Sequence, residues 1–254
     1  MFQIPFQRCQ EVDFNNVSNS FRSLLQTVQS ELSSIDESDL VLLNEIRSKA
    51  VSSTGPTDES RQSILRYHYH VSNLAPRLRG YENDMKLLFC WSGGIAPEAS
   101  IRTTCIFTDW ACFLWNLAAL ESLGGCSSSR DTDDGSRVSC RHFQQAAGIF
   151  EFIRESVLPH ITGPRNASIS RAGLEFAKNI MLGQAQLCFY EKALRDRRQG
   201  RMQAATIAKV SCQVSAFFTS AMQCATDSEL QNCLEAVCKN NTEYNAYLFA
   251  GLTH

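Results

Sequence analysis

Residues 180–196, with the sequence IMLGQAQLCFYEKALRD, form the stretch that decides the fold class. Gly183 is the one residue in this run that weakens a helix, so the pattern predicts a continuous helix over about 170–198. Apolar residues follow two faces of that helix: Leu174, Ala177, Met181, Ala185 and Cys188 on the first, and Leu182, Phe189 and Ala193 on the second. A helix with two apolar faces packs between two layers or leaves one face open for a partner.

The helical pattern continues on both sides of this segment. Apolar periodicity predicts helices over 137–158 and 204–224, and a capping-box pattern at 226–229 predicts a last helix over about 227–249. The helices predicted to begin at 137, 170 and 204 start roughly 33 residues apart, a spacing typical of stacked helical hairpins such as tetratricopeptide repeats. Because the consensus of that repeat is absent, an ordinary helical bundle is the alternative.

The first half of the chain mixes helices with short extended segments. Alternation of Phe2, Ile4 and Phe6 with other residues predicts a short edge strand. Thr57 is a candidate N-cap for a helix that stops before Pro76. The other predicted elements are helices over 14–33, 36–51 and 109–123, a strand over 86–91, a strand or extended lead-in over 101–107, and a polar loop over 124–135. We therefore expect a mainly α fold, a layered helical-hairpin solenoid with a small β-sheet or hairpin near the N-terminal half.

The composition is that of a globular protein without a strong charge bias. The chain has 254 residues, 44% of them hydrophobic, and a net charge of −2, so nothing in it indicates a nucleic-acid partner. None of the eleven cysteines forms a Cys-x-x-Cys pair, which favours reduced thiols and a cytoplasmic location. The sequence contains neither a signal-peptide pattern nor an apolar run long enough for a membrane span.

No pattern of catalytic residues emerges from the sequence. His68 and His70 are two residues apart and point to different sides of a helix, as do Cys140 and His142. Metalloprotease, nucleophile-elbow, P-loop and dinucleotide-binding motifs are absent. The acidic segment 131–135 lacks the later ligands of a calcium loop. We expect no enzymatic activity, no cofactor and no metal.

A basic cluster stands at the end of the central helix. Its members are Arg195, Arg197, Arg198 and Arg201. These side chains either remain solvated and complement the negative end of the helix, or attract an acidic partner or an anionic membrane surface.

Seven segments, in order along the chain, resemble one family. They are IPFQR at 4–8 with EVDF at 11–14, RYHY at 66–69, LFCW at 88–91, ACFLWNLAAL at 111–120, FQQAAGIF at 143–150, MLGQAQ at 181–186 and IAKV at 207–210. Each is weak alone, but together they resemble the Bro-one domain, the boomerang-shaped helical module of Alix, the His-domain tyrosine phosphatases and the rhophilins. The MLGQAQ segment resembles the phosphatase branch of the family more than Alix itself.

The resemblance implies a non-catalytic adaptor. Bro-one domains bind the C-terminal amphipathic helix of an ESCRT-III subunit, which implies a cytoplasmic protein recruited to endosomes for multivesicular-body sorting. By position, the family's apolar pocket falls on Phe189, Thr206 and Val210, and its acidic contact on Asp133. Thr206 departs from the larger aliphatic residue of the family. Core packing is the other interpretation of Phe189.

Two other functions are compatible with the resemblance. One is a rhophilin-like scaffold for small-GTPase signalling, and the other is a truncated regulatory form without ESCRT binding. The family continues beyond the point that resembles residues 251–254, so we expect a single Bro-one-like domain over 1–254 that is incomplete at its C-terminus. We therefore expect one face of the last helix to be poorly covered, and its residues are Leu230, Leu234, Val237, Tyr244 and Leu248.

Overall fold

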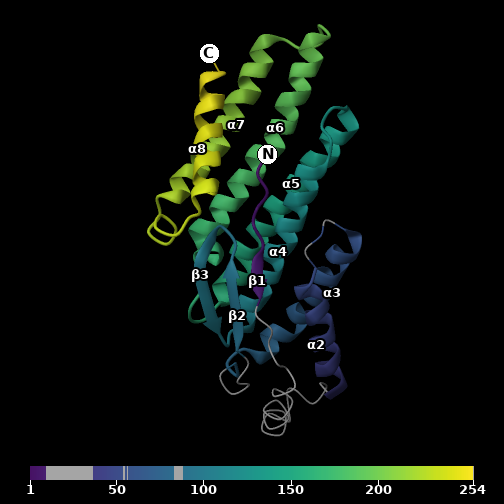
Figure 1. Ribbon diagram of the computed structural model, residues 1–254, viewed down its shortest axis with the longest axis vertical. Helices are drawn as coiled ribbons and strands as arrows, with labels where there is room; N and C mark the ends of the chain where they lie inside the picture. The colour runs from purple at the N-terminus through teal and green to yellow at the C-terminus, as the bar shows by residue number, and fades with distance from the viewer. Residues whose placement is uncertain (10–36, 54, 56, 83–87, 254) are drawn as a thin grey trace.

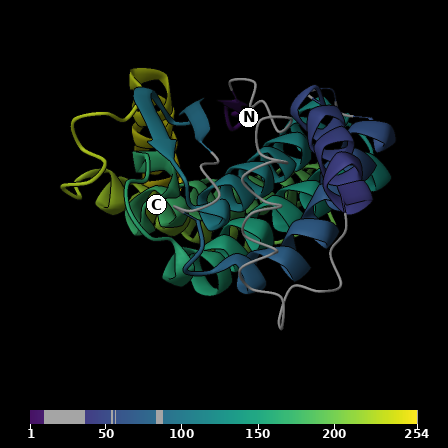
Figure 2. The ribbon, with the colours of Figure 1, turned by 90° about the horizontal axis from the view of Figure 1, so that it is seen from below.

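Layered helices make up most of the chain (Figure 1). The computed structural model describes residues 1–9, 37–53, 55, 57–82 and 88–253, so the helix predicted over 14–33 lies outside the described residues. The helices are α2 (Glu37–Val51), α3 (Asp58–Leu78), α4 (Ile106–Ser127), α5 (Asp133–Phe152), α6 (Arg171–Arg198), α7 (Ala204–Ala225) and α8 (Ala236–Gly251). From α3 to α8 each helix packs against the next, which confirms the layered helical-hairpin fold. Seen from below, α2 and α3 lie at one end of the array and α8 at the other (Figure 2).

The central helix α6 follows its sequence pattern closely. Ser170 caps it by accepting a hydrogen bond from the amide of Gly173, 2.9 Å away. All members of its first apolar stripe are buried, whereas the second stripe is covered only in part. Gly183 allows α7 to approach, because a Cβ at this position would lie 2.8 Å from the Phe218 ring. The helix therefore buries its first apolar face against neighbouring elements and leaves part of its second apolar face exposed.

Helix α4 forms the centre of the core. Every residue from Ile106 to Ser122 is buried, as expected for a helix that is covered on all sides. Two backbone amides of the N-terminal segment bind it to this helix. The Ile4 amide donates to Ser122 Oγ at 2.9 Å, and the Gln7 amide donates to Asn116 Oδ1 at 2.7 Å. Side chains of α4 thus accept hydrogen bonds from buried backbone amides of residues 4 and 7, which would otherwise lack a partner from a strand or helix.

A small antiparallel sheet lies beside the helices. Its strands are β1 (Gln7–Cys9), β2 (Phe89–Gly93) and β3 (Ala96–Thr103), in that order. The prediction of an edge strand is confirmed, but its position over residues 2–6 is wrong. The backbone groups of Ile4 and Phe2 form hydrogen bonds with side chains of α4 and α6 instead of with a strand. The strand therefore starts only at Gln7, which lies opposite Gly93 of β2.

Several predicted boundaries are corrected by tertiary packing. Helix α3 continues through Pro76 to Leu78, because burial of Ala75 and Leu78 in the core outweighs the lost hydrogen bond. Helix α4 begins at Ile106 and extends into the predicted loop as far as Ser127, while α5 begins at Asp133 under a Thr132 cap and ends at Phe152. A π-helical turn over Ile153–Val157 and a 3₁₀ turn over Leu158–His160 follow it.

The last helix starts nine residues later than the capping box predicts. Asp227 caps only a local turn, by accepting a hydrogen bond from the Glu229 amide at 2.8 Å. Leu230 is fully buried, contrary to the prediction, and the Glu235 amide donates to the Ile95 carbonyl at 2.8 Å. These contacts hold the segment against the β2–β3 hairpin, so that α8 begins at Ala236. Leu234 is also partly buried against the core, so the prediction is wrong for it as well. The predicted open face is confirmed for Val237, Tyr244 and Leu248, which are 60%, 64% and 38% exposed.

Candidate functional site

A groove runs between α5 and α6, and we call it the α5–α6 groove. Its volume is about 220 Å³. Residues from α5 recur every three or four positions along one wall, as expected for one face of a helix. The lining residues are Asp133, Ser136, Arg137, Cys140, Arg141 and Gln144 from α5, with Cys188, Phe189 and Lys192 from α6. The groove therefore combines apolar and thiol surface with cationic side chains.

Phe189 supplies the exposed aromatic surface of this groove. Its side chain is 49% exposed, although the neighbouring Cys188 is buried and its thiol lies 3.6 Å from Ser139 Oγ. Phe189 is thus not part of the buried core, so the interpretation of this residue as core packing is wrong. A half-exposed aromatic ring beside a hollow is a suitable anchor for an apolar side chain of a partner.

Asp133 lies in the first turn of α5, at the end of the groove. Its carboxylate is 3.2 Å from Lys192 Nζ and 3.3 Å from Arg195 Nη2. Hydrogen bonds from Lys192 and Arg195 lower the pKa of the Asp133 carboxyl group, so it is ionised at neutral pH. The structure therefore brings Asp133 and Phe189 to the same groove, as their common assignment to one pocket requires.

Thr206 and Val210 occupy the neighbouring helix α7, one turn apart. Thr206 is exposed and Val210 is partly buried, and neither lines the α5–α6 groove. Because α7 packs along α6, both residues lie on the helix next to the one that carries Phe189. The sequence had not indicated the cations of the opposite wall, Arg137 and Arg141, although their spacing of four residues places them on one face of α5.

The basic cluster at the end of α6 divides into two pairs. Arg195 donates to the Arg130 carbonyl at 2.6 Å and to Ser136 Oγ at 2.8 Å, and Arg201 lies 2.6 Å from the Asp196 carboxylate. Arg197 and Arg198 are exposed and form no ion pair with any residue that the structure describes. Because Arg195 and Arg201 already contact acceptors within the chain, Arg197 and Arg198 are the members of the cluster best placed to meet an anionic surface.

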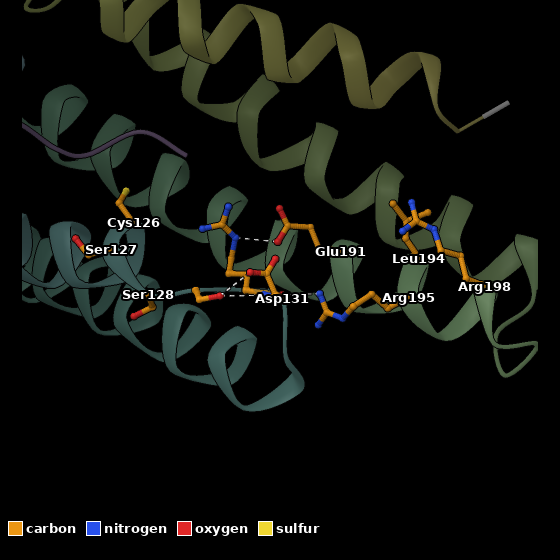
Figure 3. Close-up of a pocket in the computed structure, with 10 residues that line it drawn as sticks. Cys126, Ser127, Ser128, Asp131, Glu191, Leu194, Arg195 and Arg198 are labelled. Carbon is orange, nitrogen blue, oxygen red and sulfur yellow. Dashed lines mark hydrogen bonds and ion pairs between the residues drawn. The ribbon is translucent and has the colours of Figure 1, made fainter.

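Arg198 also borders a wide polar hollow near the α4–α5 loop (Figure 3). The hollow has a volume of about 670 Å³. Its most prominent contact is the ion pair between Arg130 Nε and Glu191 Oε2, at 2.8 Å. Since Arg195 turns toward the Arg130 carbonyl and Asp133, the arginines here chiefly fasten the loop to α6.

The described residues offer no arrangement suited to catalysis by a metal. No group of three or more His, Cys, Asp or Glu side chains that could hold an ion occurs among them. Two of the histidines have structural partners, since Trp110 donates to His68 Nδ1 at 2.9 Å and His142 Nδ1 lies 2.7 Å from Glu121. In the same part of the chain, none of the helices is both long and apolar enough to cross a bilayer.

Comparisons with known proteins agree on one family. A family model described as BRO1-like domain matches residues 1–254. ALG-2 interacting protein X of Dictyostelium discoideum is 24% identical over 257 residues, which cover 100% of this chain and 31% of that protein. Human tyrosine-protein phosphatase non-receptor type 23 is 34% identical over 206 residues, which cover 78% of this chain and 12% of that protein. The chain thus spans less than a third of the length of these two relatives.

Solved structures show the same fold. ALIX in complex with the SIVmac239 PYKEVTEDL late domain matches with a TM-score of 0.81 and 22% identity, over 100% of this chain and 36% of that chain. An ALIX BRO1 CHMP4C complex matches with a TM-score of 0.78 and 22% identity, over 100% of this chain and 71% of that chain.

Proposed function

This chain belongs to the BRO1-like domain family, and we propose that it is a non-catalytic adaptor that binds the C-terminal amphipathic helix of an ESCRT-III subunit. The partner helix would lie along the α5–α6 groove and continue over α7. Such recognition places apolar side chains at i, i+3, i+4 and i+7 of the partner into a hydrophobic trough. In this role the protein would be cytoplasmic and recruited to endosomes during multivesicular-body sorting.

The half-exposed ring of Phe189 carries this assignment. An aromatic side chain that is 49% exposed on the central helix retains apolar area to bury on binding. Val210 would add a second apolar contact from α7, and the ionised Asp133 would accept a hydrogen bond from the partner. The known complex of ALIX BRO1 with CHMP4C supports a partner of this kind for the same fold.

Titration with a labelled peptide of the C-terminal helix of CHMP4C tests the proposal directly. We expect Phe189→Asp to weaken binding by about 2 kcal/mol, or roughly thirtyfold, because it puts a charge into the apolar contact. Tyr247→Asp is the matched control, since Tyr247 is a 69% exposed aromatic residue on α8, away from the groove. If Phe189→Asp and the parent chain bind equally, with equal helicity by circular dichroism, the groove assignment is wrong.

An anionic membrane is a second partner, favoured by the two exposed arginines at the end of α6. Each basic residue near an anionic surface contributes about 1 kcal/mol. Replacing Arg197 and Arg198 with glutamate should therefore reduce sedimentation with phosphatidylserine vesicles. The ESCRT-III peptide should bind as before, because neither arginine lines the α5–α6 groove.

A further inference from the structure

A second groove lies on the other side of α5, and we call it the α3–α5 groove. Helix α4 forms its floor, while α3 and α5 form its two walls. Its volume of about 340 Å³ is within the range of ligand pockets. It shares no lining residue with the α5–α6 groove, so a ligand can occupy it independently.

The shape of the α3–α5 groove matches a short helix. On each of the three helices the first and last lining residues are seven positions apart, from Arg61 to His68 on α3, Leu114 to Glu121 on α4, and Gln145 to Phe152 on α5. Seven helical steps cover about 10 Å, or two helical turns. A partner helix with apolar residues on one face presents its side chains over the same length.

Gly148 keeps the middle of the groove open. It is an exposed residue in the interior of α5, and a Cβ added to it would meet no atom within 4 Å. Its backbone has no positive φ that would require glycine. Glycine in a helix interior costs roughly 1 kcal/mol relative to alanine, and no internal packing contact here compensates that cost. Open space for a ligand is a physical reason for glycine at this position.

The apolar surface of the groove is concentrated at its centre and one end. Leu114 and Leu117 are buried in the floor, while Ile149 is partly buried in the wall. Phe152 is 40% exposed at the end of the groove that His68 also lines. An exposed ring above buried aliphatic side chains offers area that a partner can cover.

The α3–α5 groove contains one buried acidic side chain, Glu121, and one exposed basic side chain, Arg61. The Glu121 side chain is 3% exposed, and its two oxygens are 2.6 Å from Arg61 Nε and 2.7 Å from His142 Nδ1. Arg61 is 42% exposed, and no described residue accepts a hydrogen bond from its two Nη atoms. The solvent-facing end of this ion pair is therefore positive and suits a carboxylate.

We propose that the α3–α5 groove binds an amphipathic helical segment of a partner protein, with leucine-type side chains over Leu117 and Ile149 and a carboxylate paired with Arg61. This site would let the chain hold a second partner while the α5–α6 groove is occupied. The two grooves differ in their lining, because Gly148 and the Arg61–Glu121 ion pair belong to the α3–α5 groove, whereas Phe189 and Asp133 belong to the α5–α6 groove.

A synthetic peptide can probe this groove. The probe is a fluorescein-labelled alanine-based helix with glutamate at i and leucines at i+3 and i+7, titrated into the whole chain and followed by anisotropy. We expect saturable binding that weakens at least about tenfold with Gly148→Leu, which fills the groove. A peptide with glutamine instead of glutamate should also bind more weakly. Gly251→Leu is the matched control, since a Cβ at Gly251 likewise meets no atom within 4 Å.

The outcomes separate this site from the α5–α6 groove. Phe189→Asp should leave the affinity for the probe unchanged, and it should weaken binding of the ESCRT-III peptide alone. The proposal is overturned if the probe does not saturate, if Gly148→Leu binds it as tightly as the parent chain, or if Phe189→Asp abolishes its binding. Because Gly148→Leu removes a helix-interior glycine at an open position, it should melt no lower than the parent, and a binding loss would not reflect unfolding.

Discussion

The Arg47 guanidinium holds both oxygens of the Asp109 carboxylate, with Nη2 2.6 Å from Oδ1 and Nε 3.1 Å from Oδ2. Tyr67 Oη and Trp91 Nε1 donate to the same carboxylate, at 2.6 Å and 2.8 Å. Side chains of α2, α3 and β2 thus meet on one buried residue of α4. The cluster fixes how the first helical hairpin and the sheet are placed on the core.

Arg47→Ala should destabilise the protein by about 3–5 kcal/mol, because it leaves a buried carboxylate without its counter-charge. The free energy of unfolding in urea, measured at pH 7, gives this difference. Arg137→Ala is the control, since the ion pair of Arg137 with Asp134 is almost fully exposed and contributes at most about 1 kcal/mol. Equal losses for the two variants would contradict a structural role for the Arg47–Asp109 pair.

Gly183→Ala should also destabilise the protein, although alanine is the better helix former. Its Cβ would lie 2.8 Å from the ring of Phe218, which is fully buried. Overpacking of about 1–3 kcal/mol then exceeds the helix gain of at most about 1 kcal/mol. Thermal melting measures the effect, and Gly148→Ala should raise the melting temperature in the same experiment, since its Cβ meets open space. A higher melting temperature for Gly183→Ala would show that α6 and α7 are not in close contact.

The boundaries of α6 could be predicted from sequence because local signals set them. Ser170 is an N-cap, and no proline interrupts the run up to Arg198. The Thr57 cap of α3 was predicted for the same reason, and its hydroxyl accepts from the Ser60 amide. The family resemblance is likewise confirmed, because it rested on several short segments in a fixed order.

Features set by contacts distant in sequence could not be predicted. The start of α8 depends on the hydrogen bond between Glu235 and Ile95, which no local pattern reveals. Arg195 forms hydrogen bonds with the Arg130 carbonyl and the Asp133 carboxylate, which lie about sixty residues earlier in the chain. The α3–α5 groove is formed by three helices, so it has no signature within any one of them.

Buried thiols should make the protein less stable at alkaline pH. Burial, with the Glu235 carboxylate adding to it, raises the pKa of Cys238 from 9.0 to about 12, and burial raises that of Cys140 to about 11. Between pH 9 and these values the unfolded chain loses protons that the folded chain keeps, so stability falls as pH rises. Each thiol removes on the order of 1 kcal/mol per pH unit in this window.

Urea unfolding at pH 8, 9 and 10 measures this loss, because this range brackets the ordinary thiol pKa of 9.0. Cys238→Ala should show a shallower decline than the parent chain. Cys212→Ala is the control, since Cys212 is exposed and its replacement should leave the slope unchanged. A pH-independent stability of the parent chain over this range would contradict the burial of these thiols.

The open face of α8 should bind hydrophobic dyes. Val237 and Tyr244 are 60% and 64% exposed and lie seven residues apart on one face of the helix. Replacing both with lysine should lower the fluorescence of a bound naphthalene sulfonate dye and leave the melting temperature within a few degrees, because neither side chain is in the core. Tyr69→Lys, at an exposed site on α3, is the control. A parent chain that melts cooperatively as a monomer and binds no dye would contradict an accessible apolar face.

Thr206→Leu should strengthen binding of the ESCRT-III peptide. Thr206 is exposed on α7, one turn before the partly buried Val210, so a larger aliphatic side chain at this position would lie at the surface beside Val210. The added side chain would extend the apolar surface that Phe189 begins, and each buried methylene contributes about 0.8 kcal/mol. We therefore expect an affinity gain of roughly three- to tenfold in the CHMP4C titration. Ala205→Leu is the matched control, since Ala205 is also exposed but lies on a different face of α7 from Val210. If both variants gain equally, the added leucine acts through general hydrophobicity, and Thr206 lies outside the path of the partner helix.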